Sequence, residues 1–298
     1  MATRFAAVVI QGSVVAAAWG SLMWTHGSIL GAQATPGAAT ATPKFDVATV
    51  KRNVSGAPEI GTVFQPDGHY RAFNVRVRDL VSEAYRVRGF QVAGGPPWVA
   101  SDRFDIEAKT ENAANFALVI KADGFRALPE TPFLMLRELL KDRFKLVVHR
   151  ETREGPVYAL MMVRSGVRGP GLRPPAVNCA TLDPKDPSPP VGLCEGIRRT
   201  PGRFMARTAT MTHLATSLSI LLQRLVIDRT GMSEHFDFDL EWAPAPVNSN
   251  VDAAATPVSE FAPSLLAALD EQLGLKLDAQ RAPIEYVVID SAELPTDN

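Results

Sequence analysis

The sequence lacks most of the patterns by which enzymes and nucleic-acid-binding proteins are recognised. No run of lysine and arginine is interleaved with aromatic residues, and the formal net charge of the 298 residues is −1 at pH 7, which excludes a nucleic-acid partner. No G-x-S-x-G, P-loop or G-x-G-x-x-G pattern occurs, so the commonest nucleophile and nucleotide sites are missing. With 46% hydrophobic and 21% charged residues, the composition is that of an ordinary globular protein.

Metal ligands are also sparse. The four histidines after the N-terminal segment form no H-x-x-x-H or H-E-x-x-H pattern, so no zinc ligand set is visible. His235 beside Glu234 is the best single candidate, although a surface histidine is the simpler interpretation. The sequence therefore predicts neither a metal nor a cofactor.

Long apolar segments are confined to the N-terminus. Residues 1–34 have the form of a signal peptide, with Arg4 as a minimal basic region, an apolar stretch at 5–24 and the small-x-small pattern AQA at 32–34. Cleavage after Ala34 is expected, followed by a flexible linker at 35–44. An uncleaved membrane anchor at 5–24 is the alternative, because an apolar run of about 20 residues can span a bilayer. Either way the chain is predicted to be extracytoplasmic, periplasmic or secreted, and to meet a membrane only through this segment.

Only two cysteines are present, and both fall in a proline-rich linker predicted at 165–201. Outside the cytoplasm Cys179 and Cys194 can pair, and a ring of this size stabilises a fold by about 3 kcal/mol in the chain-entropy model. A redox or metal pair is the alternative, but the spacing is not C-x-x-C and no histidine lies between the two cysteines.

Part of the chain repeats. Residues 68–85 and 202–219 match without gaps, and each stretch reads as a short strand followed by an amphipathic helix, expected at 77–86 and 211–222. A later strand follows in each copy, built around RFDIEAK at 103–109 and HFDFDLEW at 235–242. In these strands Phe104 corresponds to Phe236, and Asp105 to Asp237.

The match resumes further along the chain. Residues 133–163 and 264–290 each read as a helix followed by a hairpin, and both contain Lys-Leu, at 145–146 and 276–277. The predicted fold is α+β, with two repeated helix-strand units at 45–164 and 202–294. Its sheets are expected to be mixed or antiparallel, with the helices packed on one face and a leading strand at 45–51.

Several motifs resemble a known family. FDVATVKRN, NVRVRDLVSEAYRVRGFQVAGGPPWVASDRFDIEAK, LLKDRFKLVVHRETREGPVYALMMV and LDEQLGLKLDAQRAPIEYVVIDSAELPTDN are similar to exported soil-associated proteins expanded in acidobacteria. The resemblance covers residues 45–298. The family has no established function, so no catalytic residue is implied. Related domains joined to membrane metallopeptidases of the antibiotic-sensor type imply an extracytoplasmic sensing or binding role. The turn before Phe236 departs from the family pattern, which has a glycine there.

The acidic face of 235–242 is the most conspicuous candidate for chemistry. Residues two apart on a strand lie about 6.6 to 6.8 Å apart, so Asp237 and Asp239 could flank a cation or divide acid and base roles. The corresponding face of the first unit carries Asp105, Glu107 and Lys109. A lysine in place of the third acid favours a solvated face of mixed charge.

Two loops, 92–103 and 226–235, occupy the same place in their units and are the predicted recognition edge. Trp98 is either an exposed binding anchor or the cover of the core beneath its loop. The acidic and basic residues nearby either bind a ligand or pair locally. The candidate binding residues are Trp98, Arg103, Asp105, Asp228, Arg229 and Asp237.

We therefore expect an exported binding or sensing protein of the cell envelope that captures an envelope ligand or protein, with no recognisable catalytic constellation. Two alternatives stay open. One is an envelope hydrolase that uses carboxylates from both units. The other is a structural adaptor whose exposed strands extend a partner's sheet.

Overall fold

A computed structural model describes residues 42–120, 126–177, 196–244 and 263–296. The predicted signal peptide and anchor at 1–34, and both cysteines of the predicted disulfide, lie outside the described residues. Among the described residues, no helix combines the length and the hydrophobicity needed to cross a membrane.

The first half of the chain forms an antiparallel sheet with the strand order β1-β5-β3-β2. Its elements are β1 (Val47–Asn53), β2 (Gly61–Phe64), β3 (His69–Arg76), α1 (Val77–Ala84), the 3-10 helix η1 (Gly89–Gln91), β4 (Val92–Gly94), α2 (Trp98–Ser101), β5 (Arg103–Lys109), the 3-10 helix η2 (Ala113–Phe116), the small pair β6 (Val119–Ile120) and β7 (Arg126–Ala127), and α3 (Thr131–Phe144). The leading strand predicted at 45–51 is β1, at the edge of this sheet.

Alternation along the strands decides which face the helices cover. On β5, Phe104, Ile106 and Ala108 are buried, whereas Glu107 and Lys109 are exposed. Helix α1 packs on β3 and α3, because its apolar residues recur at helical spacing and face the core. Helices therefore cover one face of the sheet, and the other face carries charged side chains.

The second half repeats this plan with the strand order β12-β10-β9. Its elements are β9 (Gly196–Thr200), β10 (Arg203–Ala209), α4 (Met211–Leu222), β11 (Val226–Asp228), β12 (Phe236–Glu241) and α5 (Leu265–Leu273). Its own hydrophobic core includes Phe204, Phe236, Phe238 and Trp242. The α+β class predicted from the sequence is confirmed, and the boundaries predicted for the two units stay a prediction.

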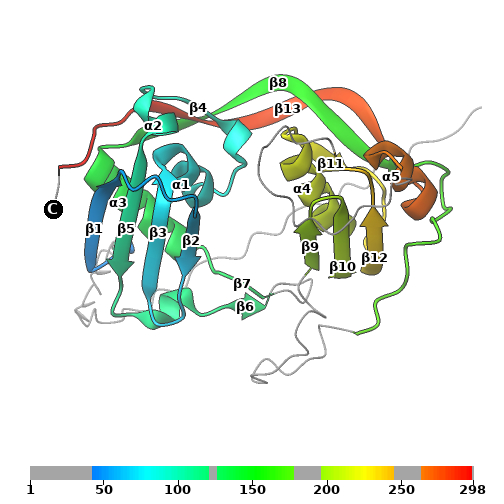
Figure 1. The fold of residues 1–298 in the computed structure, drawn as a ribbon, viewed down its shortest axis with the longest axis horizontal. Coiled ribbons are helices and arrows are strands. Elements are labelled where there is room, and N and C mark those ends of the chain that lie inside the picture. The colour runs from blue at the N-terminus through cyan, green and yellow to red at the C-terminus, as the bar shows by residue number, and fades with distance from the viewer. Residues whose placement is uncertain (1–41, 121–125, 178–195, 245–262, 297–298) are drawn as a thin grey trace, which may run out of the picture. The chain divides into compact units, whose positions relative to one another are not determined.

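The two hairpins predicted after α3 and α5 are wrong. Each segment is one long strand, β8 (Val147–Met162) and β13 (Leu275–Ser291), and these two strands pair antiparallel along their length (Figure 1). Strand β4 adds parallel to the end of β13, and β11 adds parallel to the end of β8, giving a mixed sheet β11-β8-β13-β4.

The long strands also correct the alignment of the repeat. The shared Lys-Leu pairs align Leu146 with Leu277, whereas the ends of α3 and α5 align Leu146 with Leu275. Lys145 and Gly274 both end their helices in the left-handed conformation, and the next residue, Leu146 or Leu275, is buried. A shift of two residues leaves the inward and outward faces of a strand unchanged, so the sequence pattern alone could not detect it.

Candidate functional site

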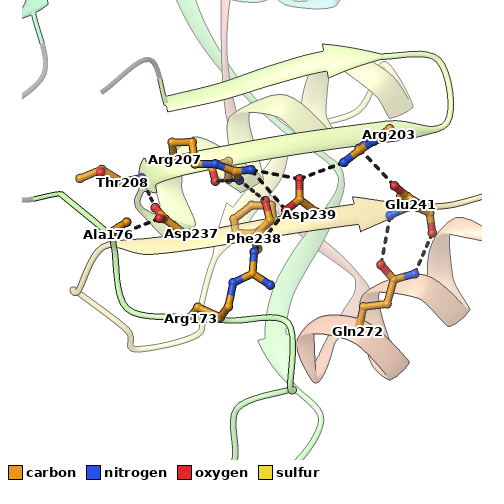
Figure 2. A network of polar contacts seen from close by, with 11 residues as sticks. Arg173, Ala176, Arg203, Arg207, Thr208, Asp237, Phe238, Asp239, Glu241 and Gln272 are labelled. Atoms are coloured by element: carbon orange, nitrogen blue, oxygen red, sulfur yellow. Dashed lines mark hydrogen bonds and ion pairs between the residues drawn. The ribbon is translucent and has the colours of Figure 1, made fainter. Parts of the chain in front are cut away.

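The acidic face of β12 is engaged mostly by the protein itself (Figure 2). Asp237 is only 7% exposed, and its carboxylate accepts hydrogen bonds from the backbone N–H groups of Thr208, at 2.7 Å, and Ala176, at 2.9 Å. Thr208 lies in an irregular stretch where the β10–β12 register shifts between Ala206 and Ala209. The carboxylate of Asp237 therefore holds a β-bulge in β10 against β12 and against the segment at Ala176.

The first half contains the same arrangement. The β3–β5 register shifts between Ala72 and Val75, and Asp105 accepts a hydrogen bond from the backbone N–H of Asn74 at 2.8 Å. Asn74 and Thr208 have φ angles of 56° and 53°, in the left-handed region that non-glycine residues seldom adopt. Asp105 and Asp237, which correspond in the repeat, thus support the same strained backbone conformation in both halves.

Asp239 is surrounded by arginine (Figure 2). Its carboxylate oxygens lie 3.2 Å from Arg173, 3.3 Å from Arg203 and 3.4 Å from Arg207. Burial alone would raise the pKa of Asp239, but the charge of Arg207 and the hydrogen bonds from the arginines outweigh it, so the pKa lies below its ordinary value. Asp239 therefore stays ionised and is a poor proton donor.

Trp98 and Arg103 contact their own half of the fold. Trp98 is partly buried and packs on Phe104 and Phe144, with ring centroids 6.2 and 6.4 Å away. The Arg103 guanidinium donates to the backbone carbonyl of Asn74 at 2.8 Å. Arg103 thus meets the bulge that Asp105 fastens, and these are the two predicted residues that the structure brings together there.

Asp228 and Arg229 lie just after the start of the second predicted loop. The Asp228 carboxylate accepts hydrogen bonds from the backbone N–H of Thr230, at 3.0 Å, and from its hydroxyl, at 2.8 Å. The side chain of Arg229 is exposed, and its backbone N–H donates to Leu160. Through these contacts Asp228 caps a turn. A ligand-binding role for the six predicted residues stays a prediction.

A pocket of about 580 Å³ opens elsewhere, in the first half. One wall is the end of the loop before β2 and β2 itself, at Ile60, Gly61 and Thr62. Helix α1 and the turn after it supply the other polar groups, and Phe133 of α3 adds an aromatic ring. Its volume lies in the range of pockets that hold small molecules or single side chains of a partner.

Glu83 lies in the pocket wall with both carboxylate oxygens engaged. It accepts hydrogen bonds from the Thr62 hydroxyl at 2.8 Å and from the Tyr70 hydroxyl at 2.9 Å. Burial raises the pKa of Glu83 above its ordinary value, although both hydrogen bonds oppose this shift. Burial, and then the charge of Glu83, raise the pKa of Tyr70 as well. A carboxyl that takes up a proton more readily than usual therefore borders the pocket.

Two arginines give the pocket its positive charge. Arg86 lies over the ring of Phe133, 4.8 Å from the centroid, and 3.6 Å from the carboxylate of Glu130. The side chain of Arg88 is half-buried, and burial lowers its pKa. In the part of the chain that the structure describes, the Arg88 guanidinium makes no ion pair or hydrogen bond. Arg88 is thus a partly desolvated cation suited to an anionic ligand.

The sequence interpretation missed this pocket, although one signal was available. In the gap-free alignment of the repeat, Glu83 falls opposite Ser217, which is buried on the apolar side of α4. An acid on one copy where the other carries a small buried residue marks a place where the halves have diverged. Arg88 lies beyond the matched stretch, so the alignment gave no signal for it.

Within the described residues, no group of three histidine, cysteine, aspartate or glutamate side chains is placed to hold a metal ion. One protein-family model, described as Protein of unknown function (DUF3738), matches residues 78–292, which is more than two thirds of the chain. No curated protein and no solved structure matches significantly.

Proposed function

The chain belongs to the DUF3738 family of unknown function, and we propose that it is an exported binding or sensing protein of the cell envelope. We place its ligand site in the pocket between β2 and α1. The observation that carries the proposal is the half-buried Arg88, whose guanidinium has no partner among the described residues, in the same pocket of about 580 Å³ as the proton-accepting carboxyl of Glu83. Perturbed groups that converge on a concave surface are typical of binding sites.

The export part of the proposal is supported by the sequence of residues 1–34, with its apolar stretch and its AQA pattern. It is tested by fractionating cells that express the full chain and determining the N-terminal residue of the mature protein. Recovery outside the cytoplasm with an N-terminus at Thr35 supports it. Recovery of the intact chain from the cytoplasm contradicts it.

Binding is tested by incubating the purified protein with cell-envelope extract and identifying what it retains by mass spectrometry. Arg88→Gln is the pocket variant, and Arg164→Gln is the matched control because Arg164 is an exposed arginine outside the pocket. We expect the retained ligand to be lost with the first variant and kept with the second. Equal retention by both would show that the ligand binds outside the pocket.

A hydrolase is the second candidate, favoured by one observation. Asp79 and Glu83 lie one helical turn apart and both line the pocket, and Arg76 holds the Asp79 carboxylate with a 2.8 Å hydrogen bond. Two carboxyl groups in one pocket can divide acid and base roles. Screening polysaccharides and peptidoglycan with the wild type and Glu83→Gln tests it, since turnover should disappear in that variant. The absence of turnover by the wild type counts against this candidate.

A further inference from the structure

Among the residues that the structure describes, the outer edge of β2 has no neighbouring strand. Strand β2 is the last strand in the order β1-β5-β3-β2, so only one of its sides is bonded to β3. The backbone N–H of Gln65 donates to the carbonyl of His69 at 2.7 Å, and antiparallel pairing alternates from there. Val63 and Gly61 therefore turn their backbone groups toward β3, whereas Thr62 and Phe64 turn theirs away from the sheet.

Nothing in the described residues bonds to those outward groups. The sequence of β2, GTVF, contains no charge and no proline, the usual devices that keep a sheet edge from pairing with another chain. The flanking Ile60 and the strand residue Val63 are 53% and 40% exposed. The edge is therefore short, apolar and open to a further strand.

The pocket is lined in part by residues of this same strand. Thr62 belongs both to the edge and to the pocket wall, and its side chain reaches the Glu83 carboxylate on α1. A strand beside a helix is the arrangement in which an extended peptide adds to the sheet through its main chain while its side chains enter the groove. The main chain gives affinity in this mode, and the pocket gives specificity.

The charges of the pocket indicate which peptide fits. The Arg88 guanidinium makes no ion pair or hydrogen bond among the described residues, whereas Arg86 already has Glu130 and the ring of Phe133. A guanidinium binds a carboxylate through two parallel hydrogen bonds, a geometry that a lysine or a neutral group cannot reproduce.

We propose that an extended peptide adds as a new strand to the outer edge of β2 and places a carboxylate on Arg88. This inference rests on the proposed function, because it assumes that the pocket is the ligand site. The carboxylate is either the C-terminus of the peptide or an acidic side chain, and the chemistry at Arg88 is the same for both.

The test uses the full chain and short fluorescent peptides of alternating valine and threonine, followed by fluorescence anisotropy. One peptide has a free C-terminus, one is amidated, and two amidated versions carry a central glutamate or lysine. We expect binding by a carboxylate-bearing peptide, weakened at least tenfold in Arg88→Gln and unchanged in Arg164→Gln. Preference for the free terminus or for the central glutamate identifies the source of the carboxylate. Equal binding of the lysine peptide would overturn the assignment to Arg88.

Strand addition is tested separately from charge. Thr62→Pro removes an outward N–H, whereas Thr62→Val keeps it and loses only the hydroxyl, so the proline variant should bind the peptide at least tenfold more weakly than the valine variant. Because the proline variant can fail to fold, the same peptide N-methylated at alternate residues is the second probe. One of the two N-methylation patterns should abolish binding to the wild type. Binding of both methylated peptides would refute strand addition.

The extract experiment separates the two proposals. Pocket-dependent retention of an envelope ligand, combined with no binding of any peptide, would overturn the peptide inference and leave the binding function supported. If Arg88→Gln changes neither the retention of the envelope ligand nor the binding of the peptides, both proposals are overturned.

Discussion

Replacement of Asp237 by asparagine should destabilise the protein because the carboxylate accepts two backbone hydrogen bonds from a nearly buried position. Asparagine has the same shape but one acceptor oxygen, so the N–H of either Thr208 or Ala176 loses its partner. A hydrogen bond to a charged group contributes about 1.5–3 kcal/mol, and a buried donor without a partner adds to the loss. We expect Asp237→Asn to lower the free energy of unfolding by about 2 kcal/mol.

The assay is urea and thermal denaturation of the full chain, followed by circular dichroism. A loss of about 2 kcal/mol corresponds to a fall in Tm of roughly 4–8 °C for a domain of this size class. The matched control is Glu241→Gln on the same strand, because the Glu241 side chain is 59% exposed and forms an ion pair with Arg203 at 3.2 Å. Exposed pairs of this kind contribute about 1 kcal/mol or less.

Equal stability of Asp237→Asn and Glu241→Gln would refute the assignment of Asp237 to the bulge. A further comparison comes from the other half, where Asp105→Asn should also destabilise the fold, because Asp105 accepts from the Asn74 backbone and from the Asn53 side chain. If Asp237→Asn kept full stability but abolished binding or turnover, the carboxylate would be functional rather than structural.

Three further outcomes are expected. Glu83→Gln should stabilise the fold increasingly as pH rises above the ordinary pKa of 4.5, because the raised pKa of Glu83 makes its ionisation unfavourable in the folded state. Urea melts over a pH series test this, and a constant difference between the variant and the wild type would contradict it. Gly169→Ala should destabilise the fold by about 3 kcal/mol, since an added Cβ would lie 2.2 Å from a backbone carbon at the end of α5. Gly166→Ala meets nothing within 4 Å and should lose only about 1 kcal/mol, for its left-handed backbone. If Cys179 and Cys194 are bonded, reductant should lower stability by about 3 kcal/mol, and thiol labelling before reduction should find neither cysteine.

Local apolar spacing was enough to predict the elements that pack against a nearby core. Helix α4 and strand β5 have the bounds expected from their periodicity, and α1 ends two residues earlier. The prediction failed at β8, where Gly155 and Pro156 resemble a turn but lie inside a paired strand. Glycine is needed at position 155 for packing instead, because an added Cβ would come within 2.7 Å of the Ile284 side chain on β13. That contact joins distant parts of the chain, so no local window could contain it.

The carboxylates of the candidate site show the same limit. The repeat marked the positions of Asp105 and Asp237. Their hydrogen-bond donors lie on another strand, at the N–H groups of Asn74 and Thr208. The pocket depends on an edge strand meeting a helix, which periodicity does not specify. Arg88 has no distinctive neighbours in the sequence, and only the tertiary structure shows that its guanidinium is half-buried and without a partner among the described residues.

The pairing of β8 with β13 has a consequence for how the two halves exchange strands. Strand β8 leaves α3 in the first half and ends beside β11 in the second, while β13 leaves α5 in the second half and ends beside β4 in the first. A polypeptide with a single copy of the unit would therefore lend its last strand to a second molecule and borrow that molecule's strand in return. Such an exchange depends on protein concentration, and joining two copies in one gene makes it intramolecular. In this chain both long strands belong to one molecule, so the exchange of strands between the halves is intramolecular.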